Sequence, residues 1–173
     1  MSSLPGADEP QRFWARVEYD GTDFYGFQVQ AAERTVQGEI ERALEAVTGA
    51  RTRVVGAGRT DRGVHARGQV VSFSAAWRHE LPDLHRALNA VLAADVAILE
   101  LDLASEGFHP RFSASRRAYR YTILNRRWRS PLERRTAWQV TQKLDLDRMA
   151  EASRSLIGTH DFATFGQPPQ GVN

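Results

Sequence analysis

The order of strand-like and helix-like segments predicts an α+β fold whose first part, residues 1–107, is a ferredoxin-like domain of the split βαβ type. Two observations lead to this prediction. Segments that are apolar at every second position, which is typical of strands, occur beside segments that are apolar at every third or fourth position, which is typical of helices. Over the first 103 residues they follow the order strand, helix, strand, strand, helix, strand. The 42% hydrophobic content is sufficient for a buried core.

The first strand and the first helix have the clearest patterns. Residues 12–19 alternate apolar and polar side chains, which indicates a strand with one buried face. Thr35 can cap the helix that follows, and Gly49 can end it. The side chains expected to face the core are Phe13, Ala15, Val17 and Tyr19 in the strand and Val36, Ile40, Leu44 and Val47 in the helix.

The other elements of this domain are expected further along the chain. Residues 52–57 and 69–75 are predicted to form the second and third strands, and residues 96–102 the last strand. A second helix is expected to start near Pro82. Its core-facing side chains would be Leu84, Leu88, Val91 and Leu92.

Residues 108–173 are predicted to form the first part of a second, basic α+β domain. Residues 118–124 and 136–141 have strand patterns, with an arginine-rich loop between them. Asp145 can cap a helix that Gly158 stops. Its inward side chains would be Leu146, Met149 and Leu156. Because a two-stranded ribbon is only marginally stable alone, two strands and one helix make a thin domain.

The positive charge of the chain is unevenly distributed. The net charge is +2, but residues 1–110 sum to −5 and residues 111–173 to +7. Most of the excess lies in residues 111–135, where nine arginines and one acid are interleaved with aromatic residues. Basic and aromatic side chains together suit a phosphate backbone with unstacked bases. A solvated basic face without a ligand is the alternative interpretation.

Composition excludes several classes of protein. There is no cysteine, so disulfides, thiolate metal sites and cysteine nucleophiles are excluded. The five histidines form no ligand-type pair, and we expect no metal site. The sequence has neither a signal-peptide pattern nor an apolar run of about 18 residues. We therefore expect a cytoplasmic protein without membrane contact.

Asp61 is the candidate for chemistry. It lies between two predicted strands, in a loop rich in glycine and arginine. Arg59 and Arg62 are expected to keep its carboxylate ionised. An ionised aspartate on a fixed loop could act as a covalent nucleophile. A surface turn in which the aspartate only pairs with arginine fits the same residues.

Six blocks of sequence carry a family resemblance. One is Gly-Arg-Thr-Asp-x-Gly-Val-His-Ala-x-Gly-Gln-Val at residues 58–70. The others lie at residues 18–28, 35–37, 108–114, 119–121 and 158–162. In residues and in order, these blocks resemble the TruA-type tRNA pseudouridine synthases. One such block would be a weak signal, whereas six in the same order are a strong one.

The resemblance implies an enzyme that isomerises uridine to pseudouridine in the anticodon arm of tRNA, without a cofactor. Asp61 would be the catalytic carboxylate and Tyr119 would stack on the target base. Arg59 would pair with Asp61 and fill the gap left by the flipped nucleotide. The residues expected to contact RNA are His109, Arg111, Arg116, Arg117, Arg126 and Arg127.

The resemblance has further implications for architecture. Family members are homodimers, and their second domain continues beyond the segments found here. We therefore expect a C-terminally truncated pseudouridine synthase fold, in which the activity of the chain alone is in question.

Two alternatives from other classes stay open. The same ferredoxin-like scaffold occurs in non-catalytic RNA-binding modules, although no aromatic RNA-recognition motif is found on a strand. A glycoside or nucleoside hydrolase could also use Asp61 as its nucleophile. That chemistry normally needs a second carboxylate, and no other acid lies near Asp61 in the sequence.

Overall fold

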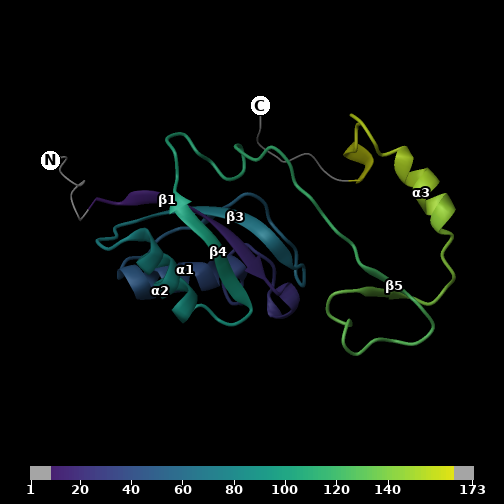
Figure 1. The fold of residues 1–173 in the computed structure, drawn as a ribbon, viewed down its shortest axis with the longest axis horizontal. Helices are drawn as coiled ribbons and strands as arrows, with labels where there is room; N and C mark the ends of the chain where they lie inside the picture. Colours follow the sequence, from purple (N-terminus) through teal and green to yellow (C-terminus); the bar gives the residue numbers. More distant parts are fainter. Residues whose placement is uncertain (1–8, 166–173) are drawn as a thin grey trace. The chain divides into compact units, whose positions relative to one another are not determined.

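The computed structural model describes residues 9–165 of the chain. The chain divides into two compact units, Met1–Tyr119 and Arg120–Asn173. Each unit is described separately below (Figure 1).

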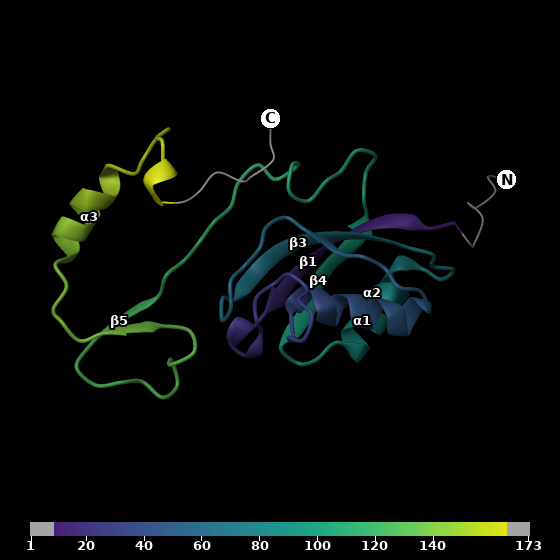
Figure 2. The same cartoon turned by 180° about the vertical axis from the view of Figure 1, so that it is seen from behind.

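The first unit is a four-stranded antiparallel sheet with two helices. The strand order is β2-β3-β1-β4, so that β3 separates β2 from β1 and β1 separates β3 from β4. Figures 1 and 2 show α1 and α2 on the same face of this sheet. The predicted order of elements in this α+β unit is confirmed. In chain order they are β1 (Gln11–Tyr19), a short 3₁₀ helix (Gly21–Asp23), α1 (Val36–Thr48), β2 (Val55–Gly56), β3 (Ala66–Ala75), α2 (Leu81–Val91) and β4 (Val96–Leu103).

The core lies between the sheet and its two helices. The predicted inward face of β1 is confirmed, because its four apolar side chains are at most 3% exposed. Ile40 and Leu44 of α1 and Leu84 and Leu88 of α2 are fully buried against this face. Each large apolar side chain buried in this way contributes about 1.5–3 kcal/mol to folding.

The ends of α1 are also as predicted. The hydroxyl oxygen of Thr35 accepts a hydrogen bond from the Gly38 amide, which satisfies one free N–H of the first turn. Gly49 ends the helix with φ of 74°, a left-handed conformation that glycine adopts without strain.

The strand β2 is shorter than the predicted 52–57, because only Val55 and Gly56 pair with β3. The Ser74 carbonyl of β3, which residue 53 would face in a longer ladder, accepts a hydrogen bond from the Thr52 hydroxyl instead. The Val54 amide donates to Oε1 of Glu41 and its carbonyl accepts from Nε2 of Gln37, so side chains of α1 hold the main chain just before the strand.

The predicted core position of Val91 is wrong. Val91 is the last residue of α2 and is 51% exposed. The backbone becomes extended at Leu92, and the Leu92 side chain packs against the core instead.

The segment after β4 belongs to the first unit, up to Tyr119. The domain boundary that the sequence predicts at residue 107 stays a prediction. Within the first unit, Pro110 is buried and Arg117 donates a hydrogen bond to the Ala57 carbonyl.

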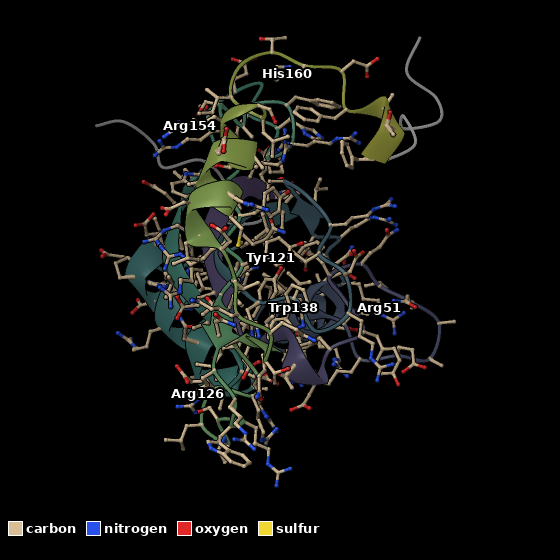
Figure 3. All side chains as sticks on the ribbon, turned by 90° about the vertical axis from the view of Figure 1, so that its right-hand side faces the viewer. Arg51, Tyr121, Arg126, Trp138, Arg154 and His160 are labelled. Carbon is tan, nitrogen blue, oxygen red and sulfur yellow. The ribbon has the colours of Figure 1, made fainter. Side chains whose placement is uncertain are left out.

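The second unit contains a short ribbon of two parallel strands, β5 (Ile123–Asn125) and β6 (Trp138–Val140). Both strands are shorter than the predicted 118–124 and 136–141. Tyr121 and Trp138, which are labelled in Figure 3, are 88% and 67% exposed. Among the described residues no layer covers these side chains, and three residues from each strand pair.

The helix α3 (Leu146–Arg154) starts as predicted but ends early. Asp145 caps it by accepting from the Arg148 amide. The predicted stop at Gly158 is wrong: the hydroxyls of Ser153 and Ser155 bond to carbonyls three residues earlier, and the backbone tightens into turns. The second unit also includes a 3₁₀ turn at Ala163–Phe165.

The predicted inward face of α3 is also wrong for the part of the chain that the structure describes. Leu146, Met149 and Leu156 are 69%, 43% and 57% exposed, and α3 buries no residue. Within residues 9–165, no helix combines the length and the apolar character needed to cross a membrane.

Candidate catalytic loop and its surroundings

Asp61 lies in the loop that connects β2 to β3, as the sequence predicted. The loop turns at this residue, because the Val64 amide donates to the Asp61 carbonyl over 3.2 Å. The Asp61 side chain is exposed. Among the described residues, neither Arg59 nor Arg62 forms an ion pair with it. The Arg62 guanidinium instead lies 4.1 Å from the centre of the Tyr25 ring.

The loop rests on the chain segment that follows β1, residues 20–28, which we call the shelf. The Phe27 amide donates to the Thr60 carbonyl over 2.9 Å, and the Gly63 amide donates to the Phe24 carbonyl over 3.4 Å. Main-chain bonds therefore join the shelf to the loop on both sides of Asp61.

Two glycines of the shelf allow this close contact. A Cβ atom on Gly21 would overlap the carbonyl oxygen of Val64. A Cβ atom on Gly26 would lie 2.8 Å from the carbonyl oxygen of Thr60. Side chains at either position would separate the two segments, so the glycines of the 18–28 block have a packing role.

The shelf is itself anchored to the first unit by Arg34. The Arg34 guanidinium lies 4.1 Å from the centre of the Phe24 ring and donates two hydrogen bonds to the Asp95 carboxylate, of 2.6 and 2.9 Å. The hydrogen bonds from Arg34 hold the pKa of Asp95 below its usual value. This charged pair fixes the shelf against the start of β4.

Tyr19 supports the loop from the sheet. Its hydroxyl oxygen is 2.8 Å from that of Thr60, the residue before Asp61. Burial raises the pKa of Tyr19, so the phenol stays neutral and can act as a hydrogen-bond partner. From β3, Nε2 of Gln69 donates to the Gly58 carbonyl over 2.8 Å.

Asp20 and His65 form a contact that sequence reasoning missed, because the two residues lie far apart in the chain. Asp20 does accept hydrogen bonds from the Thr22 amide and hydroxyl. Its Oδ1 also lies 3.0 Å from Nδ1 of His65. The Gly21 amide donates to the same Nδ1 over 3.2 Å. Nδ1 accepts from the Gly21 amide in the tautomer in which it carries no proton, and it can donate to Asp20 in the form in which it carries one. The Asp-Gly-Thr turn was the available signal, but His65 is far from it in sequence.

Residues 108–119 supply the next predicted site residues. His109 and Phe112 have ring centres 4.5 Å apart, and Nδ1 of His109 accepts from the Arg111 amide. Arg117 contacts the Asp61 loop: its Nη2 donates to the Ala57 carbonyl over 3.0 Å. Tyr119 is 77% exposed.

Arg126 and Arg127 begin the loop between β5 and β6 in the second unit (Arg126 is labelled in Figure 3). Their carbonyls accept long hydrogen bonds from Nε2 of Gln139, of 3.4 and 3.3 Å. The Arg127 guanidinium is 4.8 Å from the centre of the Trp128 ring. Both arginine side chains are exposed, so their charges face solvent.

The chain is similar to known RNA-modifying enzymes. The family model described as tRNA pseudouridine synthase matches residues 15–113, which include the shelf and the Asp61 loop. This match covers more than half of the chain, and the chain belongs to the tRNA pseudouridine synthase family.

Curated relatives within this family are named tRNA pseudouridine synthase A. The protein from Roseiflexus castenholzii is 52% identical over 155 residues, which cover 90% of this chain and 57% of the relative. Those from Borrelia hermsii and a Bradyrhizobium species are 44% and 48% identical over 155 residues, about 90% of this chain and 63% of each relative. This chain thus spans about three fifths of the length of these relatives.

Proposed function

We propose that this chain provides the catalytic loop of an enzyme that isomerises uridine to pseudouridine in the anticodon arm of tRNA. The observation that carries the proposal is the position of Asp61. Its carboxylate is exposed on a loop whose backbone is bonded to the shelf on one side and to β3 on the other. The names of the relatives support tRNA as the substrate.

The proposed reaction is an isomerisation. The N1–C1′ glycosidic bond breaks, the uracil rotates within the site, and a C5–C1′ bond forms while C5 loses its proton to N1. Nothing is oxidised or hydrolysed, so the reaction needs no cofactor. Asp61 would act on the nucleotide as a nucleophile at C1′ or C6, or as a base at C2′. An exposed carboxylate on a fixed backbone suits each of these roles.

The other site residues would bind the RNA. Tyr119 is exposed and would stack on the flipped uracil, which limits the escape of the free base. Arg59, which forms no ion pair with Asp61 in the free chain, would pair with it when RNA is bound and occupy the space that the flipped nucleotide leaves. The residues proposed to contact the RNA are His109, Arg111, Arg116, Arg126 and Arg127. Arg117 is also basic and lies in the same segment, but its side chain donates to two main-chain carbonyls.

Three further features belong to this proposal. The strand order β2-β3-β1-β4 supports a split βαβ domain of the ferredoxin-like type. We infer a homodimer and a cytoplasmic location from the function in tRNA modification.

The hydrolase alternative is less well supported. Asp20 is an acid that the fold brings to the Asp61 loop from elsewhere in the sequence. Its Oδ1 already accepts two hydrogen bonds from Thr22 and lies against His65. Asp20 is therefore engaged in holding the shelf and does not present a free carboxylic acid to a leaving group.

Formation of pseudouridine tests the proposal. The chain would be joined to the part of the Roseiflexus castenholzii relative that its match does not cover, and incubated with tRNA transcripts tritiated at C5 of uridine. We expect tritium release together with pseudouridine at anticodon-arm positions, as located by mass spectrometry. Stoichiometric tRNA binding without any tritium release would favour the non-catalytic RNA-binding alternative.

A further inference from the structure

Arg117 differs from the other arginines proposed for RNA binding because its side chain is bonded to the protein main chain. Nη2 donates to the carbonyl of Ala57 over 3.0 Å and to the carbonyl of Arg111 over 3.2 Å. An Nη atom has two N–H groups, so both can be used in these bonds. A phosphate that approached Nη2 would compete with two existing partners.

The first partner, Ala57, is the residue at which the Asp61 loop leaves the sheet. The Ala57 amide donates to the Val70 carbonyl over 2.8 Å, and the Gly58 carbonyl accepts from Gln69. These bonds attach the start of the loop to β3. Arg117 contacts the same two residues: besides the bond to Ala57, its Nε would lie 3.8 Å from a Cβ atom on Gly58, an ordinary contact distance. The start of the loop is therefore in contact with both β3 and Arg117.

The second partner, Arg111, lies in a tight turn of the segment that leads to Tyr119. The Ser113 amide donates to the His109 carbonyl over 2.8 Å, and the His109 amide donates to the Ser113 hydroxyl over 3.1 Å. Pro110, inside this turn, is buried. The bond from Arg117 to the Arg111 carbonyl closes the chain between residues 111 and 117, two residues before Tyr119.

We propose that Arg117 is a positioning residue that ties the segment carrying Tyr119 to the loop carrying Asp61. A single guanidinium would then fix the position of the segment that carries the base-stacking Tyr119 relative to the loop that carries the catalytic Asp61. This role rests on the proposed function of Asp61 and Tyr119. The two hydrogen bonds of Arg117, which we call the tie, are a property of the free protein. Displacement of a reacting group by about 1 Å can cost roughly 100-fold in rate, so such a tie would affect turnover more than affinity.

Amide hydrogen exchange of the 173-residue chain tests the tie directly. In Arg117→Met we expect peptides that cover residues 57–65 to exchange about tenfold faster, because a hydrogen bond from a charged group is lost on each side. Arg117→Lys should restore part of the protection, since an ammonium keeps the charge and has three N–H donors for main-chain carbonyls. Peptides from β1 and β4 report whether the variants stay folded.

Arg116→Met is the matched control, because it removes the same charge from the neighbouring position. We expect its loop exchange to equal that of the unchanged chain. For Arg116→Met, the slope of log tRNA affinity against log salt concentration should become less steep by about 0.7–0.9. The same slope should not change in Arg117→Met. The proposal would be overturned if amides of residues 57–65 exchanged as slowly in Arg117→Met as in the unchanged chain. A less steep dependence of tRNA affinity on salt in that variant, with unchanged exchange, would show that Arg117 contacts phosphate instead.

Turnover separates this inference from the proposed function. In the fusion with the Roseiflexus castenholzii segment, Arg117→Met should lower kcat by roughly 10- to 100-fold at saturating tRNA, with Kd changed less than about threefold. If the unsubstituted fusion forms no pseudouridine, the proposed function fails, and the exchange experiment still decides whether Arg117 holds the loop.

Discussion

A single missing side chain, that of Gly21, lets the shelf and the Asp61 loop touch. In Gly21→Ala the new Cβ would overlap the Val64 carbonyl, and both neighbours are main chain that cannot rotate away. We expect a loss of about 3 kcal/mol in the free energy of unfolding, at the upper end of overpacking costs. Urea unfolding monitored by circular dichroism measures this loss.

Gly63→Ala is the control for this prediction. Gly63 has φ of 79° and nothing within 4 Å of a built Cβ, so substitution adds backbone strain without overlap. The cost of strain alone is about 1–2 kcal/mol. If the two variants were equally stable, the contact between shelf and loop would not be as tight as described.

Local residue roles could be predicted from the sequence, and long-range roles could not. The caps of α1 at Thr35 and Gly49 follow from residues that are adjacent in the chain. The contact of Asp20 with His65 joins residues that are separated by α1 and β2 in chain order. Arg117 is a similar case. The sequence shows its charge, which predicts contact with RNA, but it does not show the carbonyl groups that its side chain binds.

At the scale of elements, the loop between β5 and β6 is the part of the basic residues 111–135 in which RNA binding can be tested most simply. Arg126 and Arg127 are exposed at its start, and their charges are not paired with acids among the described residues. In Arg126→Ala/Arg127→Ala we expect the slope of log affinity against log salt to become less steep by about 1.4–1.8, as expected for two lost phosphate contacts. Filter binding of tRNA at several salt concentrations measures this slope.

The control for the loop removes the same charge from α3. Arg148 and Arg154 lie on that helix, and Arg148 pairs with Asp145 over 3.3 Å. Arg148→Ala/Arg154→Ala should leave the slope within about 0.5 of the unchanged chain. An identical slope for the loop variant and the unchanged chain would mean that residues 126–135 form a solvated face, and that tRNA is held elsewhere.

Element boundaries deviated where side chains competed with regular pairing. The strand β2 starts late where the Thr52 hydroxyl takes the Ser74 carbonyl of β3, which residue 53 would otherwise face. The helix α3 stops early because Ser153 and Ser155 bond to carbonyls of the previous turn. Periodicity reports which face of an element is apolar, but it does not report such competition.

At the scale of the whole molecule, the two units differ in how much of their apolar surface is buried. The first unit has a continuous core, and its order of elements was predictable because six periodic segments share one sheet and one helical layer. In the second unit, as far as the structure describes it, Trp128, Trp138, Ile157 and Phe165 are all at least two-thirds exposed. Burial could not be predicted there because the described ribbon and helix provide no covering layer.

The central claim is that Asp61 performs the chemistry, and Asp61→Asn tests it most directly. Asparagine is isosteric with aspartate, but its amide cannot act as a nucleophile or as a base. The variant and the unsubstituted fusion with the Roseiflexus castenholzii segment would be compared by tritium release from uridine-labelled tRNA and by filter binding. We expect Asp61→Asn to abolish pseudouridine formation while tRNA affinity stays within a few-fold. Substantial turnover by Asp61→Asn would contradict the account, because the reaction would then depend on another group.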